Sequence, residues 1–102
     1  MTVGSDRRSS PRVSPESTPY TRAALLYPGH DVTLVNIGAG GALVRSTTRM
    51  NPGAPAELQL SGASRALVRG LIDRCAVISI DPLTYEAAVV FAAPFAIAAG
   101  SE

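Results

Sequence analysis

The feature that most constrains this chain is a series of short apolar runs separated by turns that contain glycine and proline. In the clearest run, AELQL, the apolar residues Ala56, Leu58 and Leu60 alternate with Glu57 and Gln59. A period of two places every second side chain on the same face of a β-strand, whereas a helix requires a period near 3.6 residues. The run therefore predicts a strand with one buried face and one face in solvent.

Five further runs predict strands at residues 20–27, 32–37, 42–46, 65–80 and 85–91. Run 65–80 also has apolar residues at helical spacings, but Gly70 and the β-branched ending VISI favour a bent strand. The segments PGHD, GAGG, NPGAP, SGAS and DPLT supply the turns. Six strands joined by short turns, with almost no helical pattern, indicate an all-β antiparallel barrel or sandwich.

The length of 102 residues is sufficient for one domain. Residues 1–19 are rich in serine, proline and arginine and contain few large apolar side chains, which predicts a flexible N-terminal arm. We expect a barrel domain over residues 20–95 and a short tail over residues 96–102. A domain of this size buries only about 60–65% of its unfolded surface, and so small an interior favours a binding module.

Candidate catalytic and metal-binding groups are few and scattered. Cys75 is the only cysteine, and its apolar neighbours in the sequence predict a buried, unreactive thiol. His30 belongs to the PGHD turn, where we expect it to be solvated, and the carboxylates have no metal-ligand spacing. We therefore expect neither an enzyme nor a metal site.

Charge and hydropathy bear on partners and location. The formal net charge of +1 is too small to hold a nucleic acid or an anionic membrane by charge alone. The N-terminus lacks the apolar run of a signal peptide, and the longest apolar stretch, residues 87–99, contains Pro94 and is shorter than a membrane span. We expect a soluble, cytoplasmic protein that binds neither nucleic acid nor membrane.

All nine basic residues are arginine. Genome composition is the simplest explanation, but arginine also supplies planar, bidentate donors that suit phosphate and guanine. The arm contains Arg7, Arg8 and Arg12, and the last two are separated by three residues. The positions of these arginines are therefore informative about a phosphate-bearing ligand.

The turn at residues 38–41, Gly-Ala-Gly-Gly, differs from a dinucleotide-binding fingerprint because Leu43 stands where the third glycine would fall. No helical pattern follows it either. Taken alone, the segment is a glycine-rich turn between two strands. Its surroundings add information, because Asn36 precedes the turn and lies 24 residues after Arg12.

Together the arm and the turn resemble the two hallmarks of PilZ domains, which are bacterial receptor domains for cyclic di-GMP. The family carries an arginine pair with three intervening residues, followed by an Asp/Asn-x-Ser-x-x-Gly turn between barrel strands. Arg8 and Arg12 match the first hallmark, with Arg7 as the frequent preceding arginine. Asn36 and Gly41 match the ends of the second. The similarity covers about residues 6 to 93.

Three departures from the family pattern are visible. The arm between Arg12 and the first strand carries Pro15 and Pro19, which stiffen or lengthen it. Gly38 occupies the position of the serine, so one hydroxyl is missing from the turn. The segment AAPFAIAAGSE after Phe91 is too short and too interrupted by proline for the C-terminal helix that many family members carry. The resemblance therefore implies a minimal barrel.

The resemblance implies a small six-stranded antiparallel β-barrel of the split-barrel type. It also implies a cyclic di-GMP receptor that orders its arm on binding, signals to a partner protein and needs no cofactor. The implied ligand-binding residues are Arg7, Arg8, Arg12, Asn36, Gly38 and Gly41. Arginine suits the phosphates and the guanine O6/N7 edge, the asparagine amide both donates and accepts, and glycine allows a close approach.

Two other classes of function remain open. A degenerate PilZ-like adaptor that binds a protein and no nucleotide is suggested by Gly38, which lacks the serine hydroxyl. A nucleic-acid-binding barrel would need exposed aromatic side chains for base stacking. Tyr85 and Phe91 instead fall on the apolar face of the last predicted strand, together with Ala87 and Val89.

Overall fold

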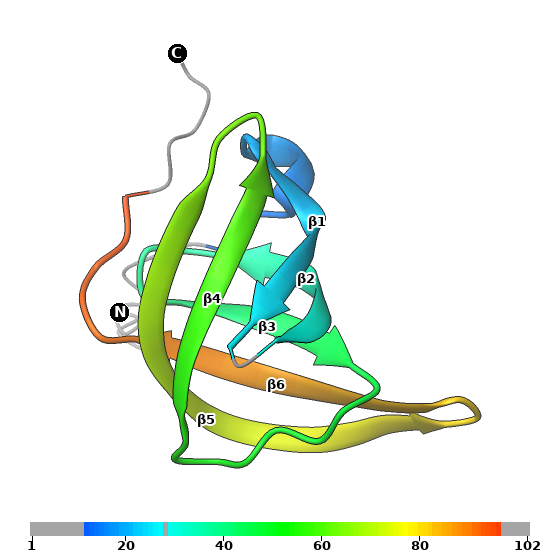
Figure 1. Cartoon of the computed structure of the whole chain (residues 1–102). Helices are drawn as coiled ribbons and strands as arrows, with labels where there is room; N and C mark the ends of the chain where they lie inside the picture. Colours follow the sequence, from blue (N-terminus) through cyan, green and yellow to red (C-terminus); the bar gives the residue numbers. More distant parts are fainter. Residues whose placement is uncertain (1–11, 28, 97–102) are drawn as a thin grey trace, which may run out of the picture.

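A computed structural model of the chain describes residues 12–27 and 29–96. Six antiparallel strands form a closed barrel in the order β1-β2-β3-β6-β5-β4, and β4 pairs with β1 to complete the ring (Figure 1). The elements are η1 (Pro15–Ser17, a 3-10 helix), β1 (Tyr20–Leu26), β2 (His30–Ile37), β3 (Gly41–Ser46), β4 (Pro55–Gly62), β5 (Ala66–Ile80) and β6 (Leu83–Phe91). The predicted six-stranded antiparallel barrel is confirmed, and the sandwich alternative is wrong.

The strands follow the predicted alternation most closely in β4. Ala56, Leu58 and Leu60 are buried in the barrel interior, and the intervening Gln59 is exposed. The run that also had helical spacing forms the single long strand β5, as predicted from Gly70 and the β-branched ending. Hydrophobic alternation therefore determines which side chains of these strands face the core.

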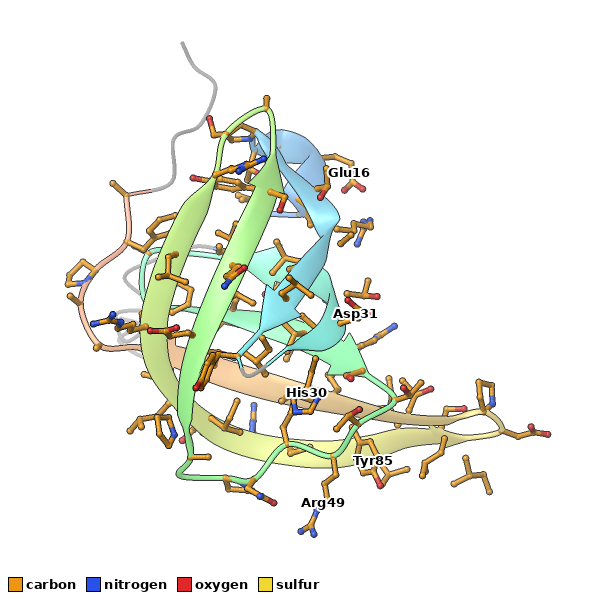
Figure 2. The ribbon with its side chains drawn as sticks, in the orientation of Figure 1. Glu16, His30, Asp31, Arg49 and Tyr85 are labelled. Carbon is orange, nitrogen blue, oxygen red and sulfur yellow. The ribbon has the colours of Figure 1, made fainter. Side chains whose placement is uncertain are left out.

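The turn between β1 and β2 is shorter than the predicted PGHD segment. His30 pairs with Leu26 and Asp31 pairs with Leu25, so both residues belong to β2. The interpretation of His30 as a solvated turn residue is wrong, because the strand pairing holds it at the start of β2, where it is half-buried (Figure 2). Backbone hydrogen bonding extended this hairpin beyond the residues with high strand propensity.

The core lies inside the barrel and consists mostly of aliphatic side chains. Its fully buried members include Leu34, Ile37, Val44, Leu58 and Val89. Tyr85 packs against this core and Phe91 is buried within it, which confirms the predicted placement of both residues. The last described segment also packs inward, because the ring of Phe95 lies 5.9 Å from that of Phe91 and 6.1 Å from that of Tyr20.

Residues 12–19 of the predicted arm lie against the barrel. Val13 and Ile37 exchange two backbone hydrogen bonds, of 2.9 and 3.0 Å. Pro15 is buried, and the carboxylate of Glu16 accepts two hydrogen bonds from Arg22 at 2.7 and 3.0 Å. This packing fixes the backbone at Arg12 beside the end of β2.

The tip of the β5–β6 hairpin projects away from the barrel (Figure 1). Its large apolar residues are exposed, namely Val77, Ile78, Ile80 and Leu83. Ile80 is the extreme case, with 82% of its surface exposed. Val77, Ile80 and Leu83 lie on the face of the hairpin that continues the inner face of β6. Ser79 pairs with Thr84 on the other face, so one face of the tip is apolar and in contact with solvent.

Candidate functional site

A β-bulge in β2 determines the orientation of Asn36. Leu34 pairs with Val44, but Asn36 pairs with Leu43, so Val35 is an extra residue without a partner in β3. Leu34 and Val44 are both fully buried, which places the next pair, Asn36 and Leu43, on the outer face of the sheet. Without the extra residue, strict alternation from Leu34 would direct Asn36 into the apolar core.

Arg12 lies directly beside Asn36 on this outer face. Its Nη1 donates a hydrogen bond of 3.2 Å to Oδ1 of Asn36. A Cβ atom added to Gly41 would lie 3.4 Å from Nη2 of the same guanidinium. The structure thus brings together three predicted site residues, although 24 residues separate Arg12 from Asn36 in the chain.

The turn that carries Gly38 is a tight hairpin between β2 and β3. The amide of Gly38 donates a 2.8 Å hydrogen bond to the carbonyl oxygen of Gly41, and the carbonyl oxygen of Gly40 accepts one from the amide of Phe91. Gly38 is buried. These bonds tie the turn to β6 and hold the backbone next to Asn36 in one conformation.

The glycine at position 41 has a structural role that the sequence did not reveal. A Cβ atom at this position would collide with the carbonyl oxygen of Val89 in the neighbouring strand β6. The close approach of β3 and β6 therefore requires glycine here, independently of any ligand. The sequence-based prediction assigned the same residue only to close approach by a nucleotide.

Arg7 and Arg8, the other two predicted site arginines, lie outside the described residues. Their assignment to the site stays a prediction. The described part of the predicted site consists of Arg12, Asn36, Gly38 and Gly41.

A row of paired residues continues from Asn36 across four adjacent strands. Asn36 in β2 pairs with Leu43 in β3, Leu43 pairs with Ala88 in β6, and Ala88 pairs with Arg74 in β5. We call these four residues the bulge row. Figure 1 shows the four strands side by side in this order.

A second bulge lies at the other end of the bulge row. In β5, Ile72 pairs with Val89 and Arg74 pairs with Ala88, so Asp73 is the extra residue. Ile72 is buried, and Asp73 and Arg74 are both exposed. Arg74 was not among the predicted site residues. Two consecutive charged residues inside an apolar strand were the available indication, because such a pair breaks strict alternation.

The charged residues beyond the bulge row form ion pairs. Nε of Arg45 donates a 2.9 Å hydrogen bond to the carboxylate of Glu86. This ion pair links β3 to β6 at the next outward-facing pair of residues after Leu43 and Ala88. A groove of about 600 Å³ runs along this region between Arg45 and Arg22. Both arginines of the groove have carboxylate partners, Glu86 for Arg45 and Glu16 for Arg22.

The surroundings of Glu16 perturb the titration of its carboxyl group. A backbone amide has the largest effect, followed by the hydroxyl of Ser14 and the guanidinium of Arg22, and together they lower the pKa of Glu16 below its ordinary value. Glu16 lies on η1 next to β1, well separated from Asp31 (Figure 2). Its charge therefore helps hold residues 12–19 in place rather than joining a carboxylate pair.

No group of three or more histidine, cysteine, aspartate or glutamate residues forms a metal-binding cluster within residues 12–27 and 29–96. Cys75 is half-buried and packs against the core, so it is more accessible than the predicted buried thiol. The same part of the chain contains no helix with the length and apolarity needed to cross a membrane.

Comparison with known proteins found no family model, no curated protein and no solved structure that matches the chain.

Proposed function

We propose that this protein is a PilZ-like receptor domain for cyclic di-GMP and that the ligand binds over the outer face near Asn36. The observation that carries the proposal is the 3.2 Å hydrogen bond between Arg12 and Asn36. It joins one residue from each of the two sequence segments that resemble the PilZ hallmarks. The PilZ resemblance itself remains part of the proposal.

The chemistry of these side chains suits the ligand. Cyclic di-GMP carries two phosphates and two guanine bases, and a guanidinium binds either a phosphate or the O6/N7 edge of guanine with two hydrogen bonds. The amide of Asn36 has both donor and acceptor groups for a base edge. In the proposed complex, the ligand displaces the Arg12–Asn36 hydrogen bond or adds to it.

The packing of residues 12–19 limits the part of the arm that responds to ligand. Val13 is already paired with Ile37, and Pro15 is buried. In the proposed mechanism the arm orders when the ligand binds, and Arg7 and Arg8, which lie outside the described residues, contact the bound nucleotide. Charged hydrogen bonds must exceed an ordering cost of about 2–5 kcal/mol. The ordered arm would then form the surface that a partner protein recognises.

Gly38 is expected to weaken binding without abolishing it. The missing serine hydroxyl removes one neutral hydrogen bond, which is worth about 0.5–1.5 kcal/mol or roughly two- to tenfold in affinity. A PilZ-like adaptor is the second candidate function. It is favoured by the exposed apolar residues at the tip of the β5–β6 hairpin, such as Ile80.

Calorimetric titration with cyclic di-GMP tests the proposal. We expect saturable binding tighter than about 100 μM at low salt. The double variant Arg8→Ala/Arg12→Ala should lose the binding heat, whereas Arg49→Ala should keep it. Arg49 is a matched control because it is exposed and follows the opposite end of β3 from Gly41. A folded wild-type protein that shows no saturable binding would favour the adaptor instead.

A further inference from the structure

The two bulges that end the bulge row have the same consequence for side-chain direction. In β2 the bulge directs Asn36 outward and Ile37 inward, and in β5 it directs Arg74 outward and Cys75 inward. Bulges are frequent next to functional sites, where they redirect a side chain. Here they act on two strands that are not neighbours, and both redirected polar residues fall on one row.

The two side chains in the middle of the bulge row, those of Leu43 and Ala88, are apolar. Leu43 is half-buried, and Ala88, whose methyl group stands between Leu43 and Arg74, is 8% exposed. The next outward-facing pair along β3 and β6, on the side toward the β2–β3 turn, is Gly41 with Val90. An apolar surface with polar groups at its edges is the usual composition of a nucleotide or small-molecule site.

The dimensions of the bulge row suit a dinucleotide. Neighbouring strands are about 4.8 Å apart, so the three spacings between β2 and β5 amount to about 14 Å along the sheet, and less across the curved barrel. A ligand with two bases and two phosphates that lies over Leu43 and Ala88 therefore reaches both Asn36 and Arg74.

We propose that Arg74 is an additional ligand-binding residue, which holds a phosphate of the dinucleotide at the end of the bulge row opposite Arg12 and Asn36. This inference rests on the proposed function. It goes beyond the two sequence motifs, because Arg74 belongs to neither. Arginine is suited to the role because its planar guanidinium binds phosphate oxygens bidentately.

The neighbouring charge of Asp73 makes the proposal more specific. Asp73 is the extra residue of the β5 bulge and is exposed like Arg74. A carboxylate at this place opposes the approach of an anionic ligand. Removal of its charge should therefore strengthen binding, whereas removal of the Arg74 charge should weaken it.

Titration of the full chain with cyclic di-GMP tests the proposal with five proteins: wild type, Arg12→Ala, Arg74→Ala, Arg69→Ala and Asp73→Asn. Arg69 is the matched control, since it is exposed on the same strand but pairs with Glu57 toward β4. We expect Arg74→Ala to bind roughly tenfold more weakly, with a difference that shrinks at high salt. Arg69→Ala should match the wild type, and Asp73→Asn should bind up to about fivefold more tightly.

The outcomes separate the two proposals. If the wild type binds and Arg12→Ala weakens binding while Arg74→Ala behaves like Arg69→Ala, the role of Arg74 is overturned and the proposed function stands. If the folded wild type does not bind, the proposed function fails and the role of Arg74 fails with it. Thermal unfolding of each variant checks that the fold is retained, and we expect unchanged midpoints because Arg74 is exposed.

Discussion

Strands β4 and β2 begin with the same alternation and differ by one inserted residue. In β4, Ala56, Leu58 and Leu60 face the core, and the pairing with β5 continues without a register shift. In β2, the extra residue Val35 interrupts the pairing with β3. The regular strand contributes its apolar face to stability, whereas the interrupted strand turns the polar Asn36 outward beside Arg12.

This difference shows how a very small barrel accommodates a candidate site. The core needs nearly all inward positions of its strands for apolar side chains. A bulge adds an outward residue without removing an inward one, since Leu34 and Ile37 on either side of it are both fully buried. We therefore expect that stability and the proposed ligand recognition can be changed separately.

The largest effect is expected in the regular strand. Leu58→Ala removes a fully buried side chain and should lower the free energy of unfolding by about 2–5 kcal/mol. Gln59→Ala, on the exposed side of the same strand, should change it by less than about 0.5 kcal/mol. Urea denaturation measures both values. Equal effects of the two substitutions would contradict the assignment of inward and outward faces.

The next effect concerns the turn that supports the candidate site. Gly41→Ala places a Cβ atom against the carbonyl oxygen of Val89, and we expect destabilisation by about 1–3 kcal/mol. Gly40→Ala is the matched control, because an added Cβ there meets no described atom within 4 Å. Thermal or urea unfolding distinguishes the two variants. A stable Gly41→Ala protein would show that β3 and β6 are not held as closely as described.

Much of the fold could be predicted from sequence because alternation and turn residues are local. The strand that contains Leu58 and the long strand interrupted by Gly70 were both predicted correctly. The bulges were harder to predict. The adjacent apolar residues Leu34 and Val35 before the polar Asn36 break the alternation, but the local sequence does not show which of them is the inserted one. Its identity follows only from the pairing with β3.

The candidate site was predicted only in part, because some of its residues come together only through strand pairing. The spacing of the two motifs indicated Arg12 and Asn36, and the structure places them in contact. Arg74 was missed because it is far from both motifs in sequence and joins Asn36 only through the pairing of four strands. The requirement for Gly41 was also nonlocal, since the atom that excludes a side chain belongs to Val89.

A smaller effect on stability is expected at the interrupted strand. Asn36→Ala removes an exposed hydrogen bond with Arg12 and should change the free energy of unfolding by less than about 0.5 kcal/mol. The same substitution should weaken cyclic di-GMP binding by roughly two- to tenfold. Unfolding and titration of one sample give both numbers. A large loss of stability with unchanged binding would mean that Asn36 supports the fold, as the inward residues of β4 do, and does not contact the ligand.

The smallest effect concerns the pH dependence of the packed residues 12–19. The pKa of Glu16 is lower in the folded than in the unfolded protein, so its contribution to stability is present above its ordinary pKa. That contribution is lost as the pH falls through the lowered value. Arg22→Gln should raise the pKa of Glu16 part of the way, because the backbone amide, the largest cause, remains.

An NMR titration of the Glu16 carboxyl measures this change directly. Arg69→Gln serves as the control, because its partner is Glu57 and it should leave the Glu16 titration where it is. An unchanged Glu16 pKa in Arg22→Gln would mean that the ion pair between η1 and β1 has no influence on the carboxylate.

The most direct test of the central claim is to map the amide chemical-shift changes of the folded protein during titration with cyclic di-GMP. We expect the largest changes at Arg12 and at the bulge row of Asn36, Leu43, Ala88 and Arg74. The amides on the outer face of β4 should be unperturbed. Saturable changes centred on β4, or no changes at all in the folded protein, would contradict the claim that the bulged face binds this ligand.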